Sequence, residues 1–115
     1  MKFFSTSQIR ELDKFTIENE PISSIDLMER AAVGITNKYV ELFKSDYPVC
    51  ILAGPGNNGG DALAVARLLL KRGYQVTAIL LSSGTISADC KTNYRRMEIQ
   101  FPRSVREHTN KFIDP

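Results

Sequence analysis

Residues 49–61 read VCILAGPGNNGGD, an apolar run that leads directly into a loop with four glycines within seven residues. A second apolar run, residues 62–70, follows the loop. So many glycines are unfavourable unless the backbone bends sharply or comes close to another group. The order predicts a buried strand over 49–53, a tight turn, and a helix that runs to Arg72 and stops at Gly73. Because ligands of open α/β sheets bind where such turns leave the strands, we expect this loop to contact the ligand.

Two helices are predicted before this loop. A short amphipathic helix over residues 8–19 follows capping hydroxyls at 5–7 and is broken before Pro21. Ser23 or Ser24 then caps a second helix of about twenty residues, because apolar side chains recur every three or four positions. The members of this predicted core stripe are Ile25, Met28, Ala32, Ile35, Tyr39 and Leu42.

After the loop and its helix, residues 75–81 form a second apolar run, which predicts a second buried strand. Ser87 is the expected cap of a further helix, and residues 99–101 are a candidate for a short third strand ended by Pro102. From Arg103 onward no period is visible, so this part is interpreted as a polar tail or connection that includes the lone His108. Strand, helix and strand form one right-handed crossover unit, which predicts an α/β fold with a parallel sheet.

Composition limits the class of protein. Among 115 residues, fifteen basic and thirteen acidic side chains give a net charge of +2, too balanced to indicate a nucleic-acid partner. We expect no membrane partner, because no apolar stretch is long enough to span one, and the start lacks a signal region. The two cysteines, Cys50 in the predicted buried strand and Cys90 in a predicted helix, are expected to be reduced, structural thiols. These features favour a soluble, cytoplasmic α/β domain.

The glycine loop excludes several nucleotide sites. Gly54, Gly56 and Gly59 match the dinucleotide-binding spacing, but the acid expected after the second strand to hold a ribose is replaced by residues 80–83, LLSS. No Gly-Lys-Ser/Thr follows, so a P-loop is excluded, and no serine stands between the glycines as a nucleophile. The distinctive feature is instead Asn57-Asn58-Gly59-Gly60-Asp61, whose amide and carboxylate oxygens suit a hard cation or sugar hydroxyls. The alternative is that both asparagines only adopt left-handed turn conformations and that Asp61 caps the helix.

The loop AGPGNNGGD (53–61), followed by Ala66-Arg67-Leu68, resembles the signature of the YjeF N-terminal domain, the NAD(P)HX epimerase family. Residues 27–31, LMERA, resemble that family's Leu-Met-Glu-x-Ala core. The resemblance covers about residues 5–100. Ala62 departs from the glycine that is usual after the aspartate.

The resemblance implies a Rossmann-like, three-layer αβα fold with a parallel sheet, here two N-terminal helices followed by βαβα. It also implies interconversion of the R and S forms of hydrated NADH and NADPH, with a potassium ion beside the phosphates. Carried over, Asn58 is the potassium ligand, and the residues expected to line the hydrate site are Gly56, Asn57, Asn58, Gly59, Gly60 and Asp61. The catalytic acid or base is unknown in this chain. Asp114 is a weak candidate for a later family motif, because the glycine-containing continuation is missing.

Two strands and a doubtful third are fewer than a doubly wound sheet needs. We therefore expect a single domain over residues 1–115 that is truncated at its C-terminal end, with sheet edges compatible with a homodimer. By itself such a fragment is expected to be inactive. Three functions stay open at this point: an epimerase, a non-catalytic ligand- or protein-binding module of the same fold, and the N-terminal part of a bifunctional epimerase and ADP- or ATP-dependent dehydratase of the kind labelled a carbohydrate kinase.

Overall fold

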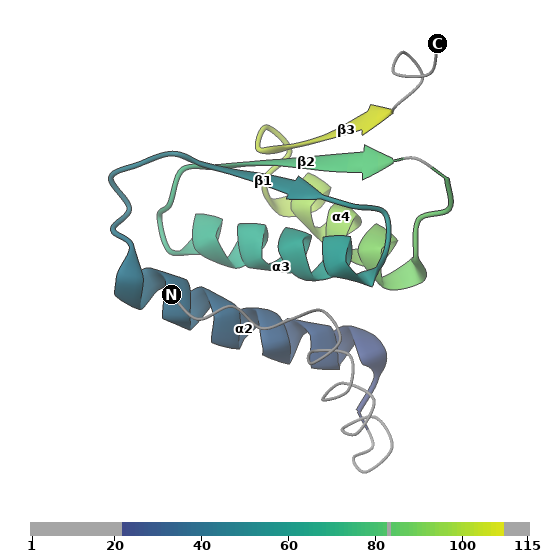
Figure 1. The fold of residues 1–115 in the computed structure, drawn as a ribbon, viewed down its shortest axis with the longest axis horizontal. Coiled ribbons are helices and arrows are strands. Elements are labelled where there is room, and N and C mark those ends of the chain that lie inside the picture. Colours follow the sequence, from purple (N-terminus) through teal and green to yellow (C-terminus); the bar gives the residue numbers. More distant parts are fainter. Residues whose placement is uncertain (1–21, 83, 110–115) are drawn as a thin grey trace.

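The computed structural model describes residues 22–82 and 84–109. The elements within these ranges are α2 (Ser24–Leu42), β1 (Val49–Ala53), α3 (Asn57–Lys71), β2 (Val76–Ser82), α4 (Ala88–Gln100) and β3 (Val105–Thr109). Figure 1 shows their arrangement. The helix predicted over residues 8–19 and the candidate Asp114 lie outside the described residues.

The strands form one parallel sheet in the order β1-β2-β3. Helix α3 connects β1 to β2, and α4 connects β2 to β3. Both helices lie against the same face of the sheet, and α2 packs on α3 on the side away from the sheet (Figure 1). The predicted α/β fold with a parallel, Rossmann-like arrangement is confirmed.

The core lies between the sheet and the pair α3 and α4. Apart from Tyr74, it is built from small and medium-sized apolar side chains, which let the helices approach the strands closely. The buried members are Ala53, Leu63, Ala66, Leu69, Tyr74, Val76, Ala78, Leu80, Cys90 and Met97.

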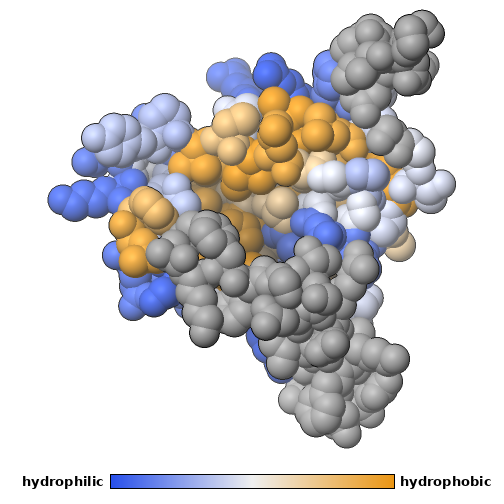
Figure 2. Space-filling model, viewed as in Figure 1, coloured by the Kyte–Doolittle hydropathy of each residue, from blue (hydrophilic) through white to orange (hydrophobic). Residues whose placement is uncertain are grey.

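The opposite face of the sheet is open in the described part of the chain. Leu52 is 62% exposed and Cys50 is also exposed. The predictions that β1 is covered on both faces and that Cys50 is buried are therefore wrong for the described residues. The apolar run arises because one set of alternate side chains enters the core while the other set remains apolar at the surface. Figure 2 shows hydrophobic side chains gathered where the strands lie in Figure 1.

The third strand is not where the sequence suggested. Residues 99 and 100 continue α4, and Phe101 is its C-cap, whose N–H donates to the carbonyl of Met97. The strand is β3, in the segment interpreted as a polar tail, with Val105 paired with Ala78 and His108 with Leu81. Because β3 lies at the edge of this sheet, charged side chains such as Arg106 and Glu107 are tolerated on it. Because of these charged residues, the segment lacks the apolar alternation that predicts a strand.

Helix α2 begins as predicted and faces the core only in part. The Ser23 hydroxyl accepts a hydrogen bond from the N–H of Asp26 at 3.3 Å. Met28 and Ala32 of the predicted stripe are buried, but Ile35 and Leu42 are 38% and 45% exposed. The buried positions Leu27 and Thr36 show that the contact face is rotated from the apolar stripe, since α2 packs on a helix instead of the sheet.

Helix α3 ends at the predicted stop. Gly73 has φ +87°, the N–H of Tyr74 donates to the carbonyl of Leu69 at 3.0 Å, and the N–H of Gly73 donates to that of Leu70 at 3.1 Å. These two bonds make a Schellman turn, which requires a residue with positive φ. No helix in the described ranges is long and apolar enough to cross a membrane.

Candidate functional site

The glycine loop is a three-residue connection between β1 and α3. Helix α3 begins directly at Asn57, with Gly56 as an N-cap that has φ −88° and ψ −166° and offers no side-chain hydrogen bond. The Gly56 carbonyl accepts hydrogen bonds from the N–H groups of Gly59 and Gly60, at 3.0 and 3.2 Å. The N–H groups of the first two helical residues have no intrahelical acceptor, so they remain available to a ligand. An uncapped helix start of this kind favours an anion.

Both structural alternatives for the polar residues of this loop are wrong. No non-glycine residue of the described ranges has a positive φ, so neither asparagine is in a left-handed turn. Asp61 is the fifth residue of α3 and does not cap it. Asn57 and Asn58 are exposed on the first turn, while Asp61 is half-buried with its Oδ1 shielded from solvent.

Glycines of the loop have two different roles. A Cβ at Gly59 would lie 1.6 Å from the carbonyl oxygen of Gly54, so only glycine lets α3 start this close to the end of β1. A Cβ at Gly60 would lie 2.9 Å from the Sδ atom of Met28. At Gly56, by contrast, a Cβ would meet no atom within 4 Å. The space beside Gly59 and Gly60 is therefore filled by the Gly54 backbone and the Met28 side chain, whereas the space beside Gly56 is open to a ligand.

The start of α4 is bound to the same loop. The N–H of Ser87 donates to the carbonyl of Pro55 at 2.9 Å, and the Ser87 hydroxyl caps α4 by accepting from the N–H of Cys90 at 3.2 Å. The Cys90 Sγ lies 3.7 Å from the carbonyl of Gly54, and burial raises the pKa of this thiol above its ordinary value. The predicted cap at Ser87 is confirmed, and Cys90 is buried. Two helix N-termini thus meet at the carboxyl edge of the sheet, where ligands of such folds bind.

The potassium prediction is compatible with these residues. Within the described ranges no three His, Cys, Asp or Glu side chains lie close enough to hold a metal ion together. A cation here would depend on amide and carbonyl oxygens, and the exposed Asn58 amide offers one. The positive end of α3 opposes a cation alone, but a diphosphate bound with it would reverse that effect.

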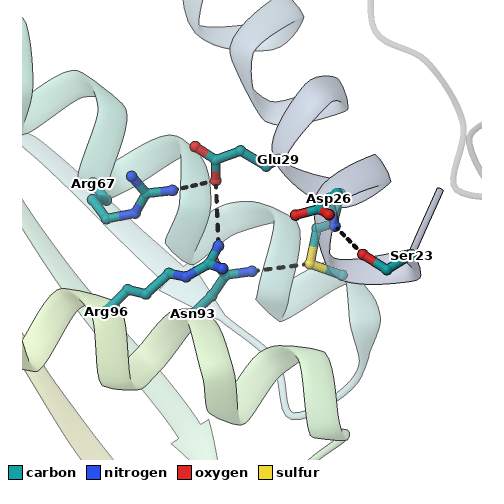
Figure 3. Close-up of polar contacts among 7 residues, drawn as sticks. Ser23, Asp26, Glu29, Arg67, Asn93 and Arg96 are labelled. Carbon is teal, nitrogen blue, oxygen red and sulfur yellow. Dashed lines mark hydrogen bonds and ion pairs between the residues drawn. The ribbon is translucent and has the colours of Figure 1, made fainter.

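Sequence reasoning missed a polar cluster between α2, α3 and α4. Arg67, 4% exposed on α3, forms an ion pair with Glu29 of α2, and Arg96 of α4 reaches the same carboxylate oxygen at 3.8 Å (Figure 3). Asn93 is 1% exposed and donates from Nδ2 to the Sδ of Met28 at 3.0 Å. One signal was available: Arg67 interrupts the apolar run of α3, and a buried arginine requires a partner.

The structure does not assign proton transfer to a described residue, although Asp61 brings a carboxylate to this site. His108 lies on β3, where its carbonyl accepts from the Ser82 hydroxyl at 3.4 Å. Its predicted place in a solvated polar tail is wrong, because it is half-buried in the sheet.

Comparison with known proteins assigns the family. The family described as YjeF-related protein N-terminus matches residues 24–113. The chain belongs to this family.

Curated relatives carry a consistent description. A protein described as NAD(P)H-hydrate epimerase from Rhodobacter capsulatus is 33% identical over 103 residues, which cover 83% of this chain and 49% of that protein. Another, from Lentilactobacillus buchneri, is 45% identical over 80 residues, covering 69% of this chain and 37% of that protein. A Bifunctional NAD(P)H-hydrate repair enzyme Nnr from Thermofilum pendens is 33% identical over 98 residues, covering 84% of this chain and 19% of that protein. The chain thus spans about half, or less, of the curated relatives that it matches.

Proposed function

We propose that the protein with this chain is an NAD(P)H-hydrate epimerase and that residues 54–61 form part of its substrate site. The observation that carries the proposal is the uncapped start of α3, where Asn57 and Asn58 are exposed on the first turn beside an open space at Gly56. The family and the relatives described as NAD(P)H-hydrate epimerase support it.

The loop is suited to hold the diphosphate of a hydrated nicotinamide dinucleotide. The N–H groups of Asn57 and Asn58 donate to phosphate oxygens, and the dipole of the fifteen-residue α3 favours the negative charge. Asn58 would hold a potassium ion through its amide oxygen. That ion, when bound, supplies positive charge that offsets the charge of the diphosphate. Asp61, half-buried one turn further along, would accept hydrogen bonds from sugar hydroxyls or from water near the ion.

Epimerisation requires a proton to leave and return at the hydrated carbon, so it needs a positioned acid or base. We propose that this chain supplies a binding part of the site, and the group that moves the proton is unknown. We therefore expect the 115-residue chain to bind the hydrate weakly and to give no turnover.

The direct test follows the interconversion of the separated S and R hydrates by chromatography, with potassium present. The protein in the form that cells produce should accelerate the interconversion, and Asn58→Ala should weaken hydrate binding and its dependence on potassium. A protein that leaves both hydrates unchanged would rule out the epimerase proposal. Unchanged potassium dependence in Asn58→Ala would remove Asn58 from the cation site.

A bifunctional repair enzyme is the second candidate. One relative has that description, and this chain matches 19% of its length. Assay of the same protein for dehydration of the hydrates with ADP or ATP distinguishes the two. A homodimer and a cytoplasmic location remain proposals, and size-exclusion chromatography with light scattering tests the first.

A further inference from the structure

Glu29 lies at the junction of three helices. Its Oε1 accepts from the Nη2 of Arg67 on α3, and the Nη1 of Arg96 on α4 lies 3.8 Å from the same oxygen. In Figure 3 the carboxylate of α2 stands between these two guanidinium groups. One acidic side chain therefore connects all three helices of the described chain.

The cluster differs from the ion pairs on the surface. The Arg67 side chain is 5% exposed and Glu29 is 30% exposed, whereas the partners in the pair Lys38–Glu41 are 60% and 69% exposed. A guanidinium this deeply buried depends on its carboxylate, because water cannot replace the lost partner. Without Glu29, two positive charges would also face each other across α3 and α4.

The neighbouring Met28 adds a second contact to each helix. Its Sδ accepts from Asn93 of α4 at 3.0 Å, and it occupies the space that a Cβ at Gly60 of α3 would need. Two consecutive residues of α2 thus touch both helices whose starts form the candidate site.

Those helix starts are in direct contact, since a Cβ at Gly60 would lie 3.3 Å from the Cα of Cys90, and they are also joined through the glycine loop. The Ser87 N–H reaches the Pro55 carbonyl from the α4 side, and the N–H groups of Gly59 and Gly60 reach the Gly56 carbonyl from the α3 side. The Ser87–Pro55 hydrogen bond connects α4 to the loop, so a change in the separation of α3 and α4 would alter this bond and would also change the packing of Gly60 against Cys90. This fact connects the junction at Glu29 to the positions of Asn57 and Asn58.

We infer that Glu29 is a positioning residue, which fixes the N-terminus of α3 relative to that of α4 and so holds the loop in the geometry that binds the ligand. The inference rests on the proposed function for its effect on the hydrate, but its effect on the loop can be measured without any ligand. Glu29 itself does not touch the substrate in this account.

The test compares amide hydrogen exchange in Glu29→Gln, the unsubstituted protein and Glu41→Gln. The last is the matched control, because it makes the same change in an exposed ion pair of the same helix. In Glu29→Gln the amides of Gly59, Gly60 and Ser87 should exchange about tenfold faster, since local opening sets these rates. The amide of Ala78, which donates to Ser104 at 2.8 Å in the sheet, should keep its rate. Glu41→Gln should change none of the four.

Each result of the exchange experiment either supports or overturns the inference about Glu29. Equal acceleration of all four amides would show a general loss of stability, and no acceleration would show that the junction does not control the loop; either result overturns the inference. If Glu29→Gln does not fold, Arg96→Gln removes only the half-exposed arm of the cluster. Faster exchange at Ser87 then supports the inference, and an unchanged rate overturns it.

Enzyme assays distinguish a failure of this inference from a failure of the proposed function. In the protein that cells produce, Glu29→Gln should raise the KM for the hydrate about tenfold with a smaller change in kcat, because the loop binds and does not move the proton. If the unsubstituted protein has no epimerase activity, the proposed function is wrong. The exchange rates of the Gly59, Gly60 and Ser87 amides would still test the role of Glu29.

Discussion

Substitution of Gly59 by alanine tests the packing that places the candidate site at the end of β1. A Cβ there would lie 1.6 Å from the oxygen and 2.7 Å from the carbon of the Gly54 carbonyl. Real Cβ contacts are almost never closer than 3.0 Å, so the start of α3 and the end of β1 must separate by 3.0 − 1.6 = 1.4 Å. Because both contacting groups are backbone, no rotamer change can relieve the overlap.

The expected loss of stability follows from two opposing effects. Overpacking of a dense site usually costs about 1–3 kcal/mol, and a clash with backbone places this case at or above the upper limit. Alanine regains about 1 kcal/mol over glycine in a helix. The net loss in the free energy of unfolding is therefore about 2 kcal/mol or more, which lowers the Tm of a domain of this size by about 10 °C.

Urea and thermal unfolding followed by circular dichroism would measure the difference. The matched control is Gly34→Ala, within α2, where a Cβ would meet no atom within 4 Å. It should raise stability by up to about 1 kcal/mol, because only the helix preference of alanine acts there. If Gly59→Ala is as stable as Gly34→Ala, the start of α3 does not pack on Gly54 and the described site geometry is wrong.

Three further experiments test the packing at Gly60, the α4 cap at Ser87 and the burial of Cys90. Gly60→Ala should cost about 1 kcal/mol, less than Gly59→Ala, because the nearest atom is the flexible Met28 Sδ at 2.9 Å; a greater loss in urea unfolding than that of Gly59→Ala would contradict this order. Ser87→Ala should lower the free energy of unfolding by about 1 kcal/mol through loss of the α4 cap, and an unchanged urea midpoint would show that the bond to Cys90 contributes nothing. Alkylation by iodoacetamide at pH 8, followed by mass spectrometry, should modify the exposed Cys50 at least about 100-fold faster than Cys90, because Cys90 is buried and its thiol pKa is raised; equal rates would contradict the burial. Since the folded-state pKa of Cys90 is raised, its neutral thiol favours folding below the ordinary value of 9.0, and this contribution is lost as the pH rises through the folded pKa.

Local signals in the sequence were sufficient for most element boundaries. The Ser23 and Ser87 caps, the Gly73 stop and the glycine turn are each decided by contacts within a few residues, and the structure shows all of them. The structure begins α3 at Asn57, inside the stretch that the sequence predicted to be a turn, so local signals located the glycine loop between strand and helix but not the first residue of the helix.

Features that depend on distant parts of the chain were harder to predict. The strand β3 is defined by pairing with β2, and its charged composition gave no sign of that pairing. The exposure of Leu52 depends on what covers the sheet, which apolarity alone does not reveal. The cluster of Glu29, Arg67 and Arg96 joins three helices whose packing has no local signature.

The central claim is that the hydrate binds at the start of α3. The most direct measurement is a titration of the ¹⁵N-labelled chain with S-NADHX in potassium buffer, followed through the amide resonances. We expect the largest shifts at Asn57 and Asn58 and smaller ones at Ser87, and we expect all of them to shrink when sodium replaces potassium. Shifts confined to the open face of the sheet around Leu52, or none at any concentration of the hydrate, would contradict it.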